Sequence, residues 1–207
     1  MTGRIKAVFF DYGNVLGTFD HMKACELLSR HSKSTAKEIY DFAFLGPIGA
    51  LRETGKVSPE EFFNVMLKKF NFTGLTFSEF CAIWGDIFEQ NPAIEEVVAG
   101  VVSEKRPVFV LSNTEELHWK YISRLPVMQR YFFELSRQVL SFQIWRKKPD
   151  VAIFNEAIRR SGFSPSQIVY FDDAPAYAET FRGLGGNAFV YDGRTDPVGI
   201  LTQGLSL

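Results

Sequence analysis

The sequence predicts an α/β protein with a parallel sheet, helices on both faces of that sheet, and a helical insertion after the first strand. Three observations lead to this fold class. Short apolar runs recur along the chain, and each ends abruptly at polar residues. Stretches with helix signals separate the runs, and a long segment after the first run has helix signals without a convincing strand. Apolar strands that alternate with helices are typical of parallel sheets buried on both faces.

Four apolar runs are the expected strands. β-branched and aromatic residues dominate them, which is the composition of buried strands. The runs and the polar residues that follow them are 5–10 before Asp11, 107–111 before Ser112, 168–171 before Asp172 and Asp173, and 188–191 before Asp192.

Helices are expected around the later strands. In the segment 150–161, Val151, Phe154 and Ile158 form an apolar stripe at spacings of three and four, as on the buried face of a helix. The other expected helices are 94–105, 115–124 and 175–184.

The segment after the first strand is expected to be a separate α-helical cap. Ser58, Pro59 and Glu61 supply an N-cap, a proline at the first helical position and a capping-box glutamate. Thr76 and Glu79 repeat the capping box. We therefore expect residues 1–17 and 92–207 to form the α/β core and residues 18–91 to form the cap.

Composition restricts the function classes. The chain has 207 residues, of which 46% are hydrophobic and 23% charged, as in globular domains. Lys and Arg number 23 against 24 Asp and Glu, so no basic excess favours a nucleic acid as partner. The first apolar run is too short and too early for a signal peptide, and no run reaches the roughly 18 apolar residues of a membrane helix. The expected location is cytoplasmic, away from the membrane.

Candidate site residues follow the strands directly. Parallel α/β sheets bind ligands at the carboxyl ends of their strands. Asp11, Ser112 and the pair Asp172 and Asp173 stand at these ends, and Lys148 lies just before a predicted helix. The set comprises a carboxylate nucleophile, a hydroxyl donor, an ammonium and paired carboxylates. Phosphoryl transfer through an aspartyl-phosphate needs these groups.

Each group has an expected role. Asp11 attacks phosphorus, which splits one displacement into two easier ones. Mg²⁺ prefers oxygen ligands, which Asp11, Asp172, Asp173 and the carbonyl of Gly13 supply. The phosphoryl oxygens are expected to bind Ser112, Lys148 and the neighbouring loop positions Gly13 and Asn113.

The same residues have structural alternatives. Ser112 caps the next helix in one alternative, with Glu115 completing a capping box. In another, Asp172 and Asp173 favour a helix N-terminus through its dipole. For Lys148, the alternative is that its neighbour Lys147 takes the role, or that this charged run has none. Asn113 either shapes its loop or contacts phosphate.

Four motifs, in order, resemble those of the haloacid dehalogenase-like (HAD) hydrolases. They are VFFDYGNVL at 8–16, VLSNT at 110–114, Lys148 with Pro149, and VYFDD at 169–173. The resemblance extends over residues 5–191. It implies a Rossmann-like core, a C1 cap, Mg²⁺ as cofactor and hydrolysis of a small phosphate ester through an aspartyl-phosphate.

The sequence departs from the family pattern at two positions. Gly13 stands where the family has a second aspartate that protonates the leaving group and then activates water. A positioned acid or base contributes roughly 10²–10⁴-fold to a rate, so its loss predicts slow turnover or an easily displaced leaving group. Tyr177 replaces an Asn or Asp near the metal, and Trp145 stands where relatives have a small residue.

The Asp-x-Gly-Asn-Val form resembles a bacterial branch that includes α-D-glucose-1-phosphate phosphatases, which suggests a sugar phosphate as substrate. Two other functions remain open. One is a catalytically weakened phosphate-binding or regulatory protein, suggested by Gly13. The other is a 2-haloacid dehalogenase, in which Asp11 attacks carbon without a metal.

Overall fold

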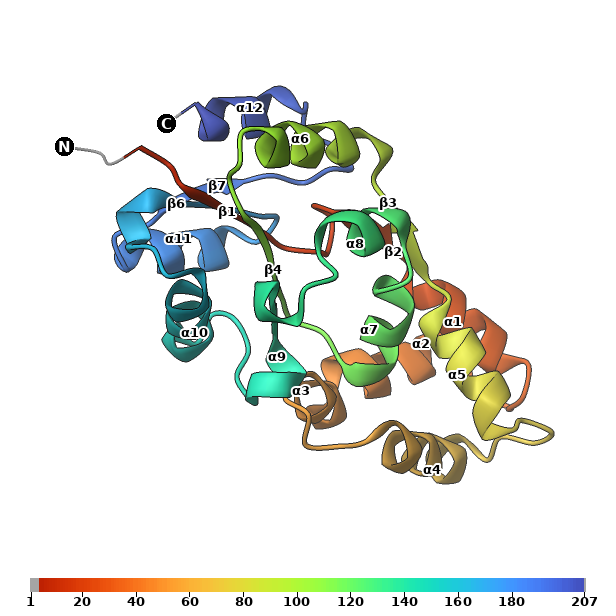
Figure 1. The fold of residues 1–207 in the computed structure, drawn as a ribbon. Helices are drawn as coiled ribbons and strands as arrows, with labels where there is room; N and C mark the ends of the chain where they lie inside the picture. The colour runs from red at the N-terminus through yellow and green to blue at the C-terminus, as the bar shows by residue number, and fades with distance from the viewer. Residues whose placement is uncertain (1–3, 207) are drawn as a thin grey trace.

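A five-stranded parallel sheet forms the centre of the molecule (Figure 1). The computed structural model describes residues 4–206. The strands across the sheet are, in order, β5 (Gln138–Leu140), β4 (Val108–Ser112), β1 (Ala7–Phe10), β6 (Ile168–Asp172) and β7 (Asn187–Val190). β1 lies in the middle, where Phe10 pairs with Val110 of β4 and Phe171 of β6. The carboxyl ends of β1, β4 and β6 therefore lie side by side.

Helices cover both faces of the sheet, as the sequence predicts. Val8 and Phe10 point to one face, and Ala7 and Phe9 point to the other, because strand side chains alternate. The first face is covered by α6 (Pro92–Ser103), α7 (Glu116–Ile122), α8 (Pro126–Tyr131) and α12 (Gly199–Leu205). The second face is covered by α10 (Val151–Ser161) and α11 (Pro175–Gly183). The α/β fold class is confirmed.

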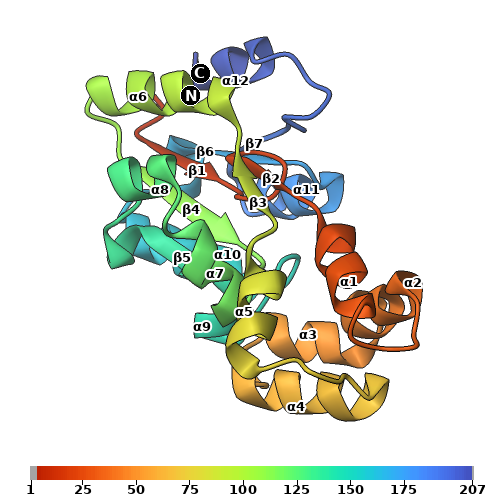
Figure 2. The same cartoon turned by 90° about the vertical axis from the view of Figure 1, so that its right-hand side faces the viewer.

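The helices after β1 lie together on one side of the molecule (Figure 2). They build a second hydrophobic core. Phe62, Phe80 and Trp84 lie at its centre. The elements are α1 (His21–Ser29), α2 (Ala36–Tyr40), the π-helical turn η1 (Asp41–Leu45), α3 (Pro47–Glu53), α4 (Pro59–Phe70) and α5 (Phe77–Gly85). The capping boxes at Ser58 and Thr76 are both present.

Two short strands stand at the ends of this helical segment, where the sequence predicts none. β2 (Gly17–Phe19) pairs antiparallel with β3 (Phe88–Gln90). The points where the chain enters and leaves the helical segment therefore lie side by side. Three residues are too few to show the alternation that signals a strand, which explains why this expectation was wrong. The division into a core of 1–17 and 92–207 and a cap of 18–91 stays a prediction, with the β2–β3 pair at its boundary.

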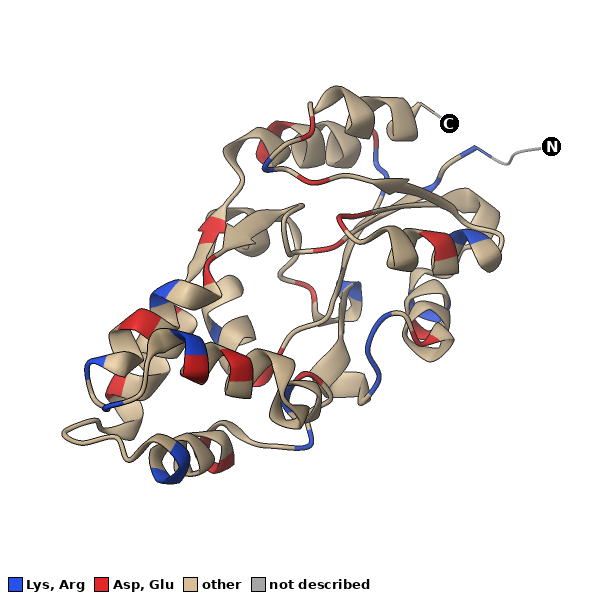
Figure 3. Ribbon diagram, turned by 180° about the vertical axis from the view of Figure 1, so that it is seen from behind, with Lys and Arg blue, Asp and Glu red and all other residues tan. Residues whose placement is uncertain are grey.

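The remaining short elements are α9 (Ser141–Ile144) and the 3-10 turns η2 (Leu135–Arg137) and η3 (Pro165–Gln167). Within residues 4–206, every helix is too short or too polar to cross a membrane. Figure 3 shows Lys and Arg interspersed with Asp and Glu along the helices of the cap.

Candidate active site

The ends of β1 and β6 bring the three predicted metal-binding aspartates together. One carboxylate oxygen each from Asp11, Asp172 and Asp173 lies within 4.8 Å of the others. The Asp11 amide donates to the carbonyl of Phe171 at 2.9 Å, which holds the two strand ends in register. Parallel neighbours are the reason that residues 161 positions apart in the chain (11 and 172) share one site.

Lys148 is fully buried beside these carboxylates. Its Nζ lies 3.0 Å from Oδ1 of Asp11 and 2.7 Å from Oδ2 of Asp172. Burial alone would lower the pKa of Lys148, but the two aspartates raise it above its usual range. Lys147 points elsewhere and pairs with Glu53 of the cap. Of the two neighbouring lysines, the structure therefore brings Lys148 into the site.

The oxygens of Asp172 are already engaged by the protein. Oδ1 accepts from the amide of Ala174 at 2.8 Å, and Oδ2 accepts from Lys148 and from the hydroxyl of Tyr170. By contrast, Asp11 accepts from the amide of Tyr12 and from Lys148 through Oδ1, and no described residue donates to its Oδ2. Asp11 therefore keeps one oxygen for an incoming group, whereas Asp172 holds Lys148 in place.

Asn14 fixes the third aspartate, and the sequence interpretation did not single it out. Its Nδ2 donates to Oδ2 of Asp173 at 2.7 Å. Its own Oδ1 is buried without a hydrogen-bond partner among the described residues. Asn14 adopts a left-handed backbone (φ 56°), which Asn tolerates better than most residues. Its position directly after Gly13 was the available signal.

The site carries more negative than positive charge. Burial raises the pKa of Asp11 to about 7; Lys148 opposes this shift, and Asp172 and Asp173 add to it. Burial also raises the pKa of Asp173. Three carboxylates against one ammonium are the environment in which a divalent cation is favourable, and an all-oxygen ligand set fits Mg²⁺. Asp11, Asp173 and the unpaired oxygen of Asn14 are groups that can face the ion or its waters.

The loop after β4 presents Ser112 and Asn113. Ser112 is the last residue of β4, and Glu115 is the N-cap residue of α7, so the alternative in which Ser112 caps that helix is wrong. No described residue bonds to the Ser112 hydroxyl, which lines a cavity. Asn113 accepts from the Lys148 amide at 2.8 Å and donates to its carbonyl at 3.0 Å. Asn113 therefore braces the loop that carries Lys148.

Phe19 fills the space beside Gly13. A Cβ atom at residue 13 would lie 3.0 Å from Cε1 of the Phe19 ring and 3.6 Å from Oδ2 of Asp11. The aromatic ring thus occupies the place toward which a side chain at residue 13 would point.

Tyr177 and Trp145 take positions that the sequence left undecided. The Tyr177 ring lies over Nζ of Lys148, 5.1 Å from the ring centre, and its hydroxyl accepts from Asn113 at 3.4 Å. Trp145 is 64% exposed and is not part of the cavity lining.

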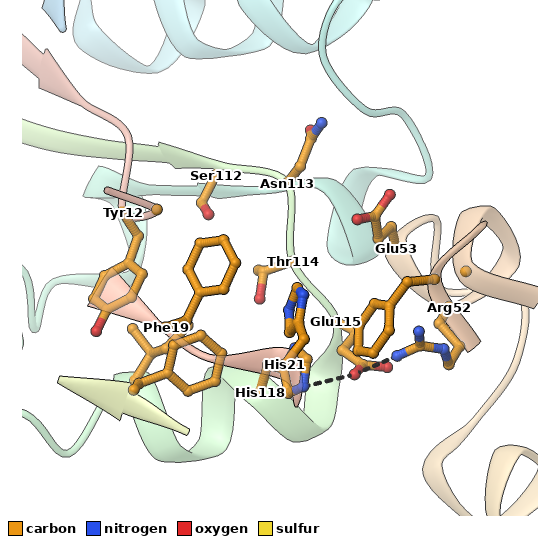
Figure 4. Close-up of a pocket in the computed structure, with 15 residues that line it drawn as sticks. Tyr12, Phe19, His21, Arg52, Glu53, Ser112, Asn113, Thr114, Glu115 and His118 are labelled. Atoms are coloured by element: carbon orange, nitrogen blue, oxygen red, sulfur yellow. Dashed lines mark ion pairs between the residues drawn. The ribbon is translucent and has the colours of Figure 1, made fainter. Parts of the chain in front are cut away.

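A cavity of about 140 Å³ leads from Gly13 and Ser112 to the cap (Figure 4). The end away from Ser112 is formed by Arg52, Glu115 and His118, none of which the sequence interpretation assigned to the site. The i, i+3 spacing of Glu115 and His118 just after the second motif was a usable signal. Arg52 is remote in sequence and had none.

Arg52, Glu115 and His118 form a buried charged cluster between α3 and the start of α7. Nη1 of Arg52 lies 2.5 Å from Oε1 of Glu115, and Nε2 of His118 lies 3.2 Å from the same oxygen without a hydrogen bond. Burial alone would raise the pKa of Glu115, but Arg52 and His118 bring it below its usual range. Burial lowers the pKa of His118 to about 4, so this imidazole is neutral at pH 7.

Comparison with known proteins places this fold. No protein-family model matches the sequence. A HAD family enzyme from Bacteroides thetaiotaomicron superposes with a TM-score of 0.82 at 21% identity, covering 96% of this chain and 98% of that one. The same enzyme was solved with magnesium and inorganic phosphate (TM-score 0.80, 22% identity, 93% and 96% covered). A predicted HAD-like family hydrolase from Porphyromonas gingivalis is similar too (TM-score 0.80, 22% identity, 99% and 100% covered). The chain therefore has the fold of the haloacid dehalogenase-like superfamily.

Proposed function

We propose that this protein is a Mg²⁺-dependent phosphatase that hydrolyses a small phosphate ester through an aspartyl-phosphate at Asp11. One observation carries the proposal: the carboxylates of Asp11, Asp172 and Asp173 meet within 4.8 Å, with Lys148 3.0 Å from the nucleophile. The similar enzyme solved with magnesium and phosphate supports the same chemistry.

In the first step, Asp11 forms a bond to phosphorus while the ester oxygen leaves. Oδ2 is the oxygen without a protein donor, so it is the attacking atom. Lys148 and the Ser112 hydroxyl lie where they can bind the phosphoryl oxygens and offset their charge. Mg²⁺, when bound, supplies the positive charge that lets two anions approach.

In the second step, water attacks phosphorus and breaks its bond to Asp11, which releases inorganic phosphate. Because Gly13 offers no acid, the departing oxygen takes its proton from water, and an oxygen of low basicity leaves most easily. This requirement favours activated esters such as anomeric sugar phosphates.

The dehalogenase alternative is less well supported. That reaction needs no metal, so it leaves the convergence of Asp173 and Asn14 on Asp11 without a purpose. A regulatory protein would keep the same site and would show phosphate binding without turnover.

Phosphate release from a panel of sugar phosphates, acyl phosphates and nucleotides, with and without Mg²⁺, tests the proposal. We expect activity that requires Mg²⁺ and falls to background in Asp11→Asn, whereas Asp86→Asn, an exposed residue in the cap, retains it. Turnover by Asp11→Asn at the rate of the unmodified protein would refute the assignment. Halide release in EDTA would establish the dehalogenase instead.

A further inference from the structure

We infer that the cavity between Gly13 and Glu115 selects esters whose leaving group is small, neutral and hydroxylated, and that Glu115 determines this selectivity. The inference rests on the proposed phosphatase function, since it concerns the part of the substrate that departs from phosphorus. It goes further by assigning the chemistry of that part to named groups.

The orientation of the substrate follows from the two ends of the cavity. Gly13, where a Cβ atom would lie 3.6 Å from Oδ2 of Asp11, and Ser112, at the end of the strand beside β1, both line the cavity, so the phosphoryl group belongs at this end. The leaving group must then extend toward Arg52, Glu115 and His118 (Figure 4). The volume of about 140 Å³ is well below the roughly 300–1,000 Å³ of pockets for drug-sized ligands, so the leaving group is small.

The charge of Arg52 is already paired with that of Glu115. Nη1 is bound to Glu115 at 2.5 Å, Nη2 donates to the carbonyl of Ala43 at 2.7 Å, and Nε is buried without a hydrogen-bond partner among the described residues. The guanidinium also packs 4.3 Å from the ring centre of Phe62 and 5.0 Å from that of Trp84. The charges of Arg52 and Glu115 offset each other, so a charged leaving group would find no unpaired opposite charge at this end.

Glu115 has an acceptor to spare. Its contacts with Arg52, with Nε1 of Trp84 at 2.6 Å and with His118 at 3.2 Å all fall on Oε1. No described residue donates to Oε2, and Glu115 lines the cavity. An ionised carboxylate is an acceptor only, so it binds a hydroxyl and repels another carboxylate.

The other residues that line the cavity also fit a small, neutral, hydroxylated leaving group. Nε2 of His118 is buried without a hydrogen-bond partner in the described chain, and the ring is neutral at pH 7. Phe19 and Phe44 present aromatic rings to the cavity for the carbon skeleton. Apolar faces with a few convergent polar groups are typical of small-molecule sites.

A matched pair of substrates tests the selectivity directly. Glycerol 3-phosphate and 3-phosphoglycerate differ only at the carbon farthest from the phosphate, which is a hydroxymethyl group in the first and a carboxylate in the second. We expect kcat/KM to be at least about tenfold higher for glycerol 3-phosphate, because like charges brought together are costly. Equal values, a preference for the acid, or a preference for ethanolamine phosphate, whose leaving group is cationic, would overturn the inference.

Variants locate the effect. Glu115→Gln keeps the shape and removes the charge, so the preference should fall at least about threefold through a gain for 3-phosphoglycerate. Glu116→Gln, at the exposed next position, should leave the preference unchanged. An unchanged preference in folded Glu115→Gln would remove Glu115 from the assignment. If that variant does not fold, the substrate pair on the unmodified protein still decides the selectivity.

Calorimetry separates failure of the inference from failure of the proposed function. Asp11→Asn protein with Mg²⁺ should bind glycerol 3-phosphate more tightly than 3-phosphoglycerate by a similar factor. Selective binding without turnover of any ester by the unmodified protein would refute the phosphatase and keep the inference. Turnover with equal binding and equal kcat/KM for the two substrates would keep the phosphatase and refute the inference.

Discussion

At the scale of single residues, Asn14 is the side chain that holds Asp173 in place. Asn14→Gly removes the amide, and the left-handed backbone (φ 56°) suits glycine, so the loop is not strained. Loss of a group that orients a metal ligand typically costs 10–100-fold in metal affinity. We expect calorimetry to show Mg²⁺ binding weakened about tenfold or more.

Asn71→Gly is the matched control, because Asn71 is also left-handed (φ 49°) but ends α4 in the cap. Its Mg²⁺ affinity should equal that of the unmodified protein. Unchanged affinity in Asn14→Gly would show that Asp173 needs no support from this amide.

Gly13 and Phe19 must change together to restore the missing acid. Because a Cβ at residue 13 would lie 3.0 Å from the Phe19 ring, Gly13→Asp alone should raise kcat little. Added to Phe19→Ala, the same substitution should raise kcat for an alkyl phosphate by about tenfold or more, toward the roughly 10²–10⁴-fold of a positioned acid. Steady-state kinetics of the four proteins measures this, and an equal gain without Phe19→Ala would contradict the steric account.

The sequence predicted the residues at strand ends and missed those that support them. Asp11, Ser112 and Asp172 follow apolar runs, and parallel pairing places such ends together, so their meeting could be foreseen. Arg52 could not be foreseen, because its approach to Glu115 depends on how the cap packs against α7.

At the scale of elements, the ion pair between Arg52 of α3 and Glu115 at the start of α7 joins the helical segment after β1 to the helices that cover the sheet. Arg52→Met leaves a buried carboxylate without its partner, which typically costs 3–5 kcal/mol. We expect the free energy of unfolding in urea to fall by about 3 kcal/mol or more.

The exposed pair of Lys37 and Asp41 provides the comparison. Lys37→Met should change the free energy of unfolding by less than about 1 kcal/mol, since exposed pairs contribute little. If both substitutions lowered the free energy of unfolding equally, the ion pair between Arg52 and Glu115 would contribute no more than an exposed pair.

Long apolar or capped elements were predictable, and short ones were not. β4 and α10 match their expected ranges closely. β5, with three residues at the sheet edge, gave no signal, and neither did β2 and β3. Such strands form because tertiary pairing favours them, not because of local propensity.

At the scale of the whole molecule, stability should depend on pH through His118. Its pKa is lowered to about 4 from an unfolded value near 6.5, so the unfolded chain binds more protons between these values. With His118 neutral, the free energy of unfolding has its full value above about pH 6.5. It decreases as the pH falls toward 4, because the unfolded chain takes up the proton more readily. Asp11 acts in the opposite direction, because its pKa is raised to about 7.

Comparison with His118→Gln isolates this contribution. Between pH 7 and 4, the free energy of unfolding should fall by about 2–3 kcal/mol more in the unmodified protein than in the variant. Denaturant titrations at each pH measure the difference. Parallel pH profiles would show that His118 is protonated without cost to the fold.

The proposed function depends on Asp11 as the nucleophile, beside the meeting carboxylates and the buried Lys148. The most direct measurement is mass spectrometry of the protein after acid quench during turnover of a phosphate ester with Mg²⁺. We predict a phosphoryl group on the peptide that carries Asp11, absent without Mg²⁺ and in Asp11→Asn. Steady phosphate release with no phosphoryl group on that peptide, and with full turnover in Asp11→Asn, would contradict the account.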